Sequence, residues 1–342
     1  MDRPLVAVVL AGGTGTRLYP ASRKDRPKQF CSFGGDRSLL ARTVDRVSFA
    51  DDIVVLTGDR YADRIGEHAP DADVLVEPAP KDTGPALVYA AARLQERFED
   101  PVLLTLPSDH HVAGDFETPA REAAHVAHET GGLITLGVEP TRPATGYGYI
   151  EPEEEPSAGS SVNYAPVARF REKPDGDRAS ALVEAGCYWN AGIFAWTPDT
   201  LLREARGTPV DSIARAADSD PTEEALETAI EDVDPISIDY AVLERTEEAY
   251  VVPVAFEWDD LGSWDAMERI VDLDADGNAV LGDALTLDAA DNVIATDDAH
   301  VSVLGAEDLV VAAYDDRVLV VPKDEAQGVR AVVDRLRDAG LF

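Results

Sequence analysis

Residues 5–15 read Leu-Val-Ala-Val-Val-Leu-Ala-Gly-Gly-Thr-Gly, an unbroken apolar run followed at once by a glycine-rich stretch. A continuous apolar run is typical of a strand that is buried on both faces of a sheet. Similar short runs follow at 53–57, 74–76, 102–106 and 133–138. The sequence therefore predicts a set of buried strands, with a sharp turn after the first of them.

Stretches with helical spacing separate these runs, at 38–47, 85–98 and 119–129. Strands that alternate with helices predict an α/β fold with a doubly wound, mostly parallel sheet. Ligands of such sheets bind beyond the carboxyl ends of the strands, and we expect the functional residues there. Further along, residues 151–161 are predicted to form an exposed hairpin tip, and 211–232 an acidic helical stretch.

The sequence pattern changes after Asp272, where Gly-Asn and Asp-Asn pairs separate short Val/Leu strands. We predict an α/β domain over residues 1–271 and a small β-rich domain over 272–342. The chain ends in a predicted amphipathic helix at 324–339, with its apolar side chains turned inward. These side chains are Val329, Val332, Val333 and Leu336.

Composition excludes several classes of partner. The chain has 342 residues, with 30 Lys and Arg against 66 Asp and Glu, so its formal net charge is −36. Nucleic acids and anionic membranes would be repelled, and no apolar run has the length of a membrane span. We expect no signal peptide. The two cysteines, Cys31 and Cys187, form no disulfide framework, which favours the cytoplasm.

Lysine is scarce among the cations, with only five lysines among the 30 Lys and Arg residues. A strongly acidic surface with little Lys is expected of a halophilic protein, because concentrated salt screens the self-repulsion. The alternative is an ordinary acidic protein.

The first motif that carries chemistry follows the first strand. Its three glycines let backbone N–H groups approach phosphate, although it is neither the dinucleotide fingerprint nor a Walker loop. Five cations then fall within twelve residues of an otherwise anionic chain, which indicates a polyanionic ligand such as a nucleoside triphosphate. They are Arg17, Arg23, Lys24, Arg26 and Lys28.

Residues 11–18, together with the sequence Pro-Lys-Gln-Phe at 27–30, resemble the signature of sugar-1-phosphate nucleotidylyltransferases, and of mannose-1-phosphate guanylyltransferases in particular. The resemblance implies a Rossmann-like nucleotidyltransferase domain, a β-helix-like C-terminal domain, and GTP and mannose 1-phosphate as substrates. It implies that Arg17 and Lys28 stabilise the departing pyrophosphate. The nucleotide would be held by Leu10, Ala11, Gly12, Gly13, Thr14, Gly15 and Thr16.

Residues 77–86 resemble the base-binding turn of this family, with Lys81-Asp82 where the family usually has Arg-Asn. The resemblance assigns Asp82, Thr83, Gly84 and Pro85 to the nucleotide, and Asp82 could accept from the guanine N1–H and N2–H. The same residues also suit a helix N-cap with Pro in the first turn, and both interpretations can hold together.

Two carboxylates are implied as ligands of Mg²⁺. Asp109, in Pro-Ser-Asp-His, matches the family's metal-binding Asp, and Asp260 matches the second one in Trp-x-Asp-x-Gly-x-Trp. A hard cation takes one or two carboxylates together with phosphate oxygens. Asp259 stays open as an alternative to Asp260, and a lone Asp after a strand is more often a cap.

Three segments resemble the family's sugar-phosphate contacts, which implies that Gly146, Tyr147, Glu172, Lys173 and Asn190 bind the sugar phosphate, with Lys173 aligning the attacking phosphate. Each segment taken singly also suits an ordinary turn, ion pair or packed strand. Residues 237–244 resemble a box of the mannose-type enzymes. They also suit a helix N-terminus capped by Ser237.

Two other functions stay open. One is a thymidylyl- or uridylyltransferase that acts on glucose 1-phosphate. The other is a catalytically silent sugar-nucleotide-binding regulator. Family analogy implies that the β-rich domain could form a homodimer.

Overall fold

The computed structural model describes residues 3–13, 15–155 and 162–342. Contacts divide the chain into two compact units. Unit 1 contains residues 1–12, 44–108 and 112–258, and unit 2 contains residues 13–43, 109–111 and 259–342. The two units interleave along the chain. The linear boundary expected at residues 271/272 therefore stays a prediction.

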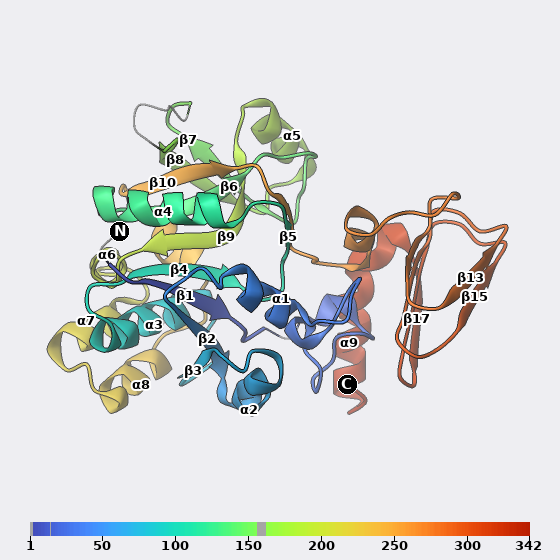
Figure 1. Ribbon diagram of the computed structural model, residues 1–342, viewed down its shortest axis with the longest axis horizontal. Coiled ribbons are helices and arrows are strands. Elements are labelled where there is room, and N and C mark those ends of the chain that lie inside the picture. The colour runs from blue at the N-terminus through green and yellow to red at the C-terminus, as the bar shows by residue number, and fades with distance from the viewer. Residues whose placement is uncertain (1–2, 14, 156–161) are drawn as a thin grey trace. The chain divides into compact units, whose positions relative to one another are not determined.

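Unit 1 is built on a sheet with the strand order β3-β2-β1-β4-β9-β6-β10-β8-β7 (Figure 1). Its first four strands are parallel, as are β6 and β10, whereas β9 is antiparallel to both β4 and β6. The predicted α/β class is confirmed, and the sheet is mixed. Its strands are β1 (Leu5–Leu10), β2 (Asp52–Gly58), β3 (Asp73–Glu77), β4 (Val102–Pro107), β6 (Leu133–Val138), β7 (Gly148–Pro152), β8 (Ala165–Glu172), β9 (Tyr188–Trp196) and β10 (Ala249–Val254).

Helices cover this sheet because its strands are apolar on both faces. Val6 and Val8 of β1 lie in one cluster with the buried residues of α3, α6, α7 and α8, so the alternate residues of β1 point to the opposite face. The helices of unit 1 are α2 (Asp59–His68), α3 (Thr83–Arg97), α4 (Glu117–Thr130), α5 (Gly176–Glu184), α6 (Pro198–Glu204), α7 (Asp211–Ser219), α8 (Glu223–Glu231) and the π-helix η3 (Asp239–Leu243). The chain passes between the units in α1 (Leu39–Arg46), β5 (His111–Ala113) and β11 (Glu257–Asp259).

Some helices of unit 1 were not expected from the sequence, among them α2, α5 and α6. Helix α2 was not expected, because only Tyr61 and Ile65 of its ten residues are buried. The acidic helical stretch predicted at 211–232 forms two helices, because the segment around Pro221 separates α7 from α8. The predicted hairpin tip at 151–161 falls partly on residues 156–161, which lie outside the described residues.

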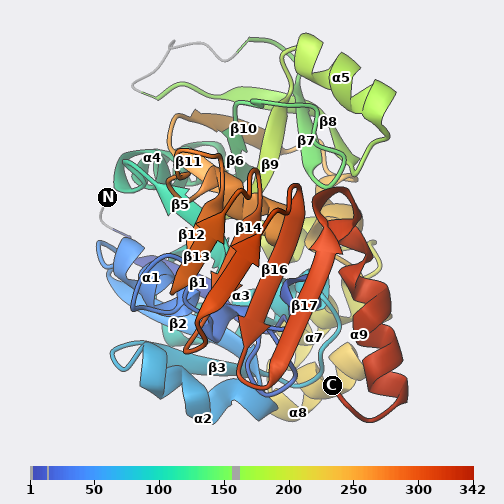
Figure 2. The same cartoon turned by 90° about the vertical axis from the view of Figure 1, so that its right-hand side faces the viewer.

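Unit 2 contains a four-stranded sheet, β12-β14-β16-β17, and a two-stranded sheet, β13-β15 (Figure 2). Strands β12, β14 and β16 are parallel, and β17 returns antiparallel to β16. The β-rich C-terminal region is therefore confirmed. The elements of unit 2 are η1 (Thr16–Leu18), η2 (Lys28–Phe30), η4 (Trp264–Arg269), β12 (Ala279–Leu281), β13 (Ala284–Leu287), β14 (Val293–Thr296), β15 (Val301–Leu304), β16 (Leu309–Tyr314), β17 (Arg317–Pro322), η5 (Lys323–Gly328) and α9 (Val329–Asp338).

Two fully buried asparagines join successive turns of this region. Asn278 Oδ1 accepts from Asn292 N at 3.0 Å and from Asn292 Nδ2 at 2.9 Å. Asn292 Oδ1 in turn accepts from Leu309 N at 3.0 Å. Because buried amides are costly unless they are hydrogen-bonded, this ladder fixes how the turns stack.

The C-terminal helix is shorter than expected, because residues 323–328 form the 3₁₀ segment η5. Val329 and Val333 are buried and pack in one cluster with Leu319 of β17. Val332 is 42 % exposed, so its predicted inward orientation is wrong. The buried stripe is narrower than the sequence pattern suggested. No helix in the described part of the chain is long and apolar enough to cross a membrane.

Candidate active site

The backbone beyond β1 is fixed by its neighbours in the sheet. Leu10 lies opposite Leu56 of β2 and Pro107 of β4. Ala11 N donates to Leu56 O at 2.8 Å, and Thr57 Oγ1 donates to Ala11 O at 3.0 Å. The start of the glycine-rich stretch therefore leaves the sheet at the carboxyl ends of parallel strands, as predicted.

A carboxyl group lies against this stretch. A Cβ added to Gly12 would lie 3.0 Å from Glu77 Oε1, at the end of β3. Burial, and secondarily the charge of Asp82, raises the pKa of Glu77 to about 7. Glu77 lies in the motif at 77–86 but is not among the predicted site residues. An acid that ends an otherwise apolar strand is the signal that could have identified it.

The predicted base-binding turn begins helix α3. Asp82 has a φ of 72°, and its Oδ1 accepts from Thr83 N at 2.7 Å, so the predicted N-cap is confirmed. Gly84 and Pro85 are buried in the first turn of the helix. The contact between this turn and a base stays a prediction.

In unit 2, Gly15 provides the space that Lys28 occupies. Gly15 has a φ of 59°, and a Cβ at this position would lie 2.2 Å from Lys28 Cβ. No other residue type fits this position without moving the backbone or Lys28, since both the conformation and the space favour glycine. Thr14 is outside the described residues.

Lys28 brings the two predicted metal-binding segments together. Its side chain is 5 % exposed, and Nζ donates to Asp109 Oδ2 at 2.9 Å and to the backbone oxygen of Asp260 at 2.6 Å. A buried ammonium requires such partners, because it has lost its hydration. The structure therefore places one predicted phosphate ligand and both predicted metal ligands in one cluster.

The charges of this cluster keep Asp109 ionised. Burial raises the pKa of Asp109, but Lys28 and His110 oppose this effect, and the net pKa is lowered. Burial also lowers the pKa of His110, which favours a neutral imidazole beside the carboxylate. An ionised carboxylate is the form that binds a divalent cation.

Asp259 and Asp260, the two candidates for the second metal ligand, have different hydrogen-bond and ion-pair partners. Asp259 is buried, and its Oδ2 forms an ion pair with Arg269 Nε at 2.6 Å, while its Oδ1 accepts from Leu261 N at 2.9 Å. In the described part of the chain, Asp260 Oδ1 accepts from Gly262 N at 2.9 Å, and the Asp260 carboxylate has no ion pair. These partners favour Asp260 over Asp259 as a metal ligand, and that role stays a prediction.

Asp109 and Asp260 fit Mg²⁺ as a pair of hard oxygen donors beside a buried ammonium. No group of three or more His, Cys, Asp or Glu side chains in the described part of the chain could hold a metal ion. Mg²⁺ commonly takes one or two carboxylates and completes its coordination with phosphates and water, so this donor set suits a metal that arrives with a nucleotide.

The remaining predicted cations have separate partners. Arg17 donates to Gln327 Oε1 at 3.5 Å. Arg23 forms ion pairs with Asp315 and Asp316, and Arg26 lies 3.6 Å from Asp315. The expectation that all five cations face a polyanion therefore lacks support for Arg23 and Arg26, which pair with acids of the β-rich region.

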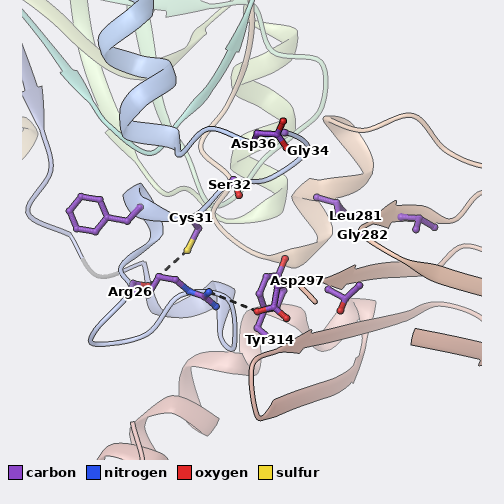
Figure 3. A pocket seen from close by; sticks show the side chains of 13 residues that line it. Arg26, Cys31, Ser32, Gly34, Asp36, Leu281, Gly282, Asp297 and Tyr314 are labelled. Carbon is purple, nitrogen blue, oxygen red and sulfur yellow. Dashed lines mark hydrogen bonds and ion pairs between the residues drawn. The ribbon is translucent and has the colours of Figure 1, made fainter. Parts of the chain in front are cut away.

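Arg26 also borders a cavity of about 500 Å³ within unit 2 (Figure 3). The guanidinium carbon lies 5.5 Å from the centroid of the Tyr314 ring, and Nη1 lies 3.9 Å from Asp297 Oδ2. The cavity wall thus combines one paired cation with two acids, Asp36 and Asp297.

In unit 1, the predicted residues Gly146, Tyr147, Glu172 and Lys173 lie where β7 begins and β8 ends. Gly148 pairs with Glu172 across β7 and β8, and a Cβ on Gly148 would lie 2.6 Å from Glu172 Oε2. Glu172 Oε1 accepts from Lys173 Nζ at 2.5 Å. Lys173 has a φ of 45°, and its N donates to Tyr147 O at 3.2 Å. The turn thus holds a carboxylate and an ammonium side by side.

The side chains of Asn190 and Tyr147, two of the predicted sugar-phosphate residues, have different partners. Asn190 Nδ2 donates to Asp239 Oδ1 at 2.7 Å. The ring of Tyr147 is buried against Trp189 and Trp258, and its hydroxyl accepts from Arg142 at 3.0 Å. Tyr147 therefore supports the loop that contains Gly146, and its contact with a sugar stays a prediction.

This fold and these groups define a nucleotidyl transferase. The family model described as Nucleotidyl transferase matches residues 6–277. A second model, described as MannoseP isomerase/GMP-like beta-helix domain, matches residues 282–336. The chain belongs to the nucleotidyl transferase family, and its C-terminal part is similar to the β-helix domain found in mannose-phosphate enzymes.

Individual relatives narrow the comparison. The chain is 34% identical to the alginate biosynthesis protein AlgA of Pseudomonas putida, over 98% of this chain and 72% of the relative. It is 36% identical to mannose-1-phosphate guanylyltransferase of Sinorhizobium fredii, over 97% of this chain and 68% of the relative. A crystal structure described as mannose-1-phosphate geranyltransferase from Thermus thermophilus matches with a TM-score of 0.88 and 36% identity, over 98% of this chain and 99% of that one.

Proposed function

We propose that this chain is a mannose-1-phosphate guanylyltransferase, which transfers GMP from GTP to mannose 1-phosphate and releases pyrophosphate. The observation that supports this most is the cluster of Lys28, Asp109 and Asp260, in which a buried ammonium meets the two carboxylate segments. The proposed substrates rest on the relative named mannose-1-phosphate guanylyltransferase at 36% identity.

The proposed reaction is a direct displacement at the α-phosphorus of GTP. An oxygen of mannose 1-phosphate forms a new bond to the α-phosphorus. The bond from the α-phosphorus to the oxygen shared with the β-phosphorus breaks, and its electron pair leaves with pyrophosphate. The attacking phosphate is already anionic at neutral pH, so no protein nucleophile or general base is required. Catalysis then depends on positioning and charge neutralisation.

The chain's residues divide this work. Asp109 and Asp260 would hold Mg²⁺, which when bound neutralises charge on the phosphate oxygens. Arg17 and Lys28 would stabilise the departing pyrophosphate. The backbone of residues 10–13, with Asp82 and the turn that follows it, would bind the nucleotide.

The acceptor would bind along β7, β8 and β9. Glu172 would accept from sugar hydroxyls, Lys173 would align the phosphate, and Asn190 would donate to the sugar. Gly146 leaves the backbone open, because no atom lies within 4 Å of a Cβ added there, and Gly148 leaves room for the Glu172 carboxylate. A site without side chains at these positions gives a hexose close access to the backbone.

A substrate panel tests this assignment. Pyrophosphate release should be measured with each of four nucleoside triphosphates and with mannose, glucose and galactose 1-phosphates, in molar KCl with MgCl₂. We expect GTP with mannose 1-phosphate to give the highest kcat/KM. Preference for dTTP or UTP with glucose 1-phosphate would replace the proposal with the alternative transferase. Tight binding of GDP-mannose without turnover would make the chain a silent regulator.

The acidic surface supports further proposals about the protein in solution. We propose a cytoplasmic, halophilic enzyme, since 66 acidic residues face only 30 cations. We also propose a homodimer through the β-rich region, where large apolar side chains are more than half exposed. These side chains are Leu285, Leu287, Leu304, Val318 and Val320. Light scattering in molar KCl should give twice the chain mass, and Leu287→Asp with Leu304→Asp should give a monomer.

A further inference from the structure

Residues 236–239 lie against residues 81–84, although about 150 residues separate the two segments in the sequence. Ile236 N donates to Lys81 O at 3.1 Å, and Gly84 N donates to Ile236 O at 3.0 Å. Ile238 N donates to Thr83 Oγ1 at 3.0 Å. The segment is therefore hydrogen-bonded to the turn that begins α3.

The contact between this segment and α3 is too close for a side chain at Gly84. A Cβ on Gly84 would lie 2.7 Å from Ile236 O and 3.3 Å from Ala241 Cβ. The oxygen belongs to the backbone and cannot move aside as a flexible side chain would. The position of residues 236–241 thus depends on the first turn of α3.

Asp239, the next residue in this segment, holds the Asn190 side chain in one orientation. Asp239 Oδ1 accepts from Asn190 Nδ2 at 2.7 Å. Asn190 Oδ1 accepts from Gly192 N at 3.0 Å and from Thr135 Oγ1 at 3.3 Å. These contacts use the amide oxygen and one amide hydrogen, and they leave the second hydrogen of Nδ2 for another acceptor.

The surroundings of Asp239 raise the pKa of its carboxyl group. Burial, and secondarily the charge of Glu172, raises the pKa of Asp239 to about 6. The hydrogen bond from Asn190 and the charge of Lys173 act in the opposite direction. Tyr240, Glu172, Lys173 and Asn190 are therefore the polar groups that face this carboxyl.

The backbone at Asp239 is also unusual. Residues 239–243 form a π-helix, in which Glu244 N donates to Asp239 O at 2.9 Å. Single π-helical turns are rare and frequently occur at functional sites. The widened turn begins at the residue whose side chain reaches Asn190.

We infer that Asp239 is a positioning residue for the acceptor sugar: it orients the Asn190 amide toward a hexose hydroxyl, on a segment that is hydrogen-bonded to the turn for the base. This inference rests on the proposed function and extends it to a residue outside the predicted site. Asp239 acts through Asn190. Its loss should therefore weaken binding of the sugar phosphate and leave binding of the nucleotide nearly unchanged.

Three variants test the inference. Asp239→Ala removes the acceptor for Asn190 Nδ2, whereas Asp239→Asn keeps an oxygen that can accept the same hydrogen bond. Asp234→Asn is the matched control, because it removes one charge from an exposed acid five residues before Asp239. KM for mannose 1-phosphate, KM for GTP and kcat should be measured for each variant in molar KCl, with circular dichroism and thermal melting as checks of folding.

We expect Asp239→Ala to raise KM for mannose 1-phosphate roughly tenfold or more, since it removes a hydrogen bond to a charged group. KM for GTP should stay within about twofold. Asp239→Asn should raise KM for the sugar phosphate less. In the wild type this KM should rise more steeply below about pH 6 than it does in Asp239→Asn, because protonation of Asp239 weakens the acceptor. The rise that both proteins share comes from the phosphate of the substrate, whose second pKa is also about 6.

A folded Asp239→Ala variant with an unchanged KM for the sugar phosphate would overturn the inference. An equal loss in both KM values, or the same loss in Asp234→Asn, would also overturn it, since either result indicates a general structural effect. The proposed function fails differently. If the wild type prefers another nucleotide or hexose 1-phosphate, that assignment is wrong, and the same variants test Asp239 with the preferred sugar.

Discussion

Gly15→Ala tests the packing that places Lys28 in the site. The change adds one methyl group and no charge. Gly15 has a φ of 59°, a conformation that costs other L-residues about 1–2 kcal/mol. The new Cβ would lie 2.2 Å from Lys28 Cβ. Forcing atoms into a filled region costs about a further 1–3 kcal/mol, so the variant should lose about 2–5 kcal/mol of stability.

The same substitution should impair catalysis beyond its effect on stability. Lys28 cannot keep both its position and its contacts with Asp109 and the Asp260 backbone. A displacement of about 1 Å in a positioned group costs roughly a hundredfold in rate. Denaturant unfolding in molar KCl and pyrophosphate release below the melting temperature measure the two effects separately.

Gly35→Ala is the control for this experiment, because no atom lies within 4 Å of a Cβ added there. Its free energy of unfolding should stay within about 0.5 kcal/mol of the wild type. If Gly15→Ala matches this control in stability and in rate, the proposed placement of Lys28 against Gly15 is refuted.

Further predictions concern charge. Asp260→Asn should reduce turnover about a hundredfold or more and weaken the Mg²⁺ dependence. Asp259→Asn should mainly lower the melting temperature, because it breaks the ion pair with Arg269. The reverse pattern would mean that Asp259 is the metal ligand and Asp260 the structural residue. Glu77 has a pKa of about 7, above that of an ordinary carboxyl, so the stability that it contributes is complete below the usual carboxyl pKa and is lost as the pH rises through 7. Glu77→Gln should remove this pH dependence from melting temperatures measured between pH 5 and 8. An unchanged dependence would contradict the raised pKa of Glu77. The net charge of −36 predicts a melting temperature that rises steeply from dilute buffer to molar KCl, and equal melting in both would contradict the halophilic proposal.

The first strands of the sheet followed from apolar runs, because burial on both faces of a sheet leaves a plain pattern in the sequence. Helices α3 and α4 followed from helical spacing, whereas β10, α5 and α6 were not predicted. Helix α2 escaped detection because it buries only two side chains. Val332 was misassigned because spacing along a helix indicates one face but not the width of the stripe that its partner covers.

Site residues that belong to a sequence motif could be predicted. Contacts between residues that are far apart in the sequence could not. Lys28, Asp109 and Asp260 were identified from sequence, and their contacts support the grouping. The pairing of Arg23 and Arg26 with acids some 290 residues later left no local signal. The contact of Asp239 with Asn190 likewise depends on the π-helix and on how its segment meets α3.

The central claim is that a metal-dependent transfer of GMP takes place on this chain. The most direct measurement follows GTP and mannose 1-phosphate by ³¹P NMR in molar KCl, with Mg²⁺ present and then removed by EDTA. The account predicts one GDP-mannose for each pyrophosphate formed with Mg²⁺, and neither product after chelation. Products that form equally well with EDTA, or GTP that is hydrolysed without the sugar nucleotide, would contradict it.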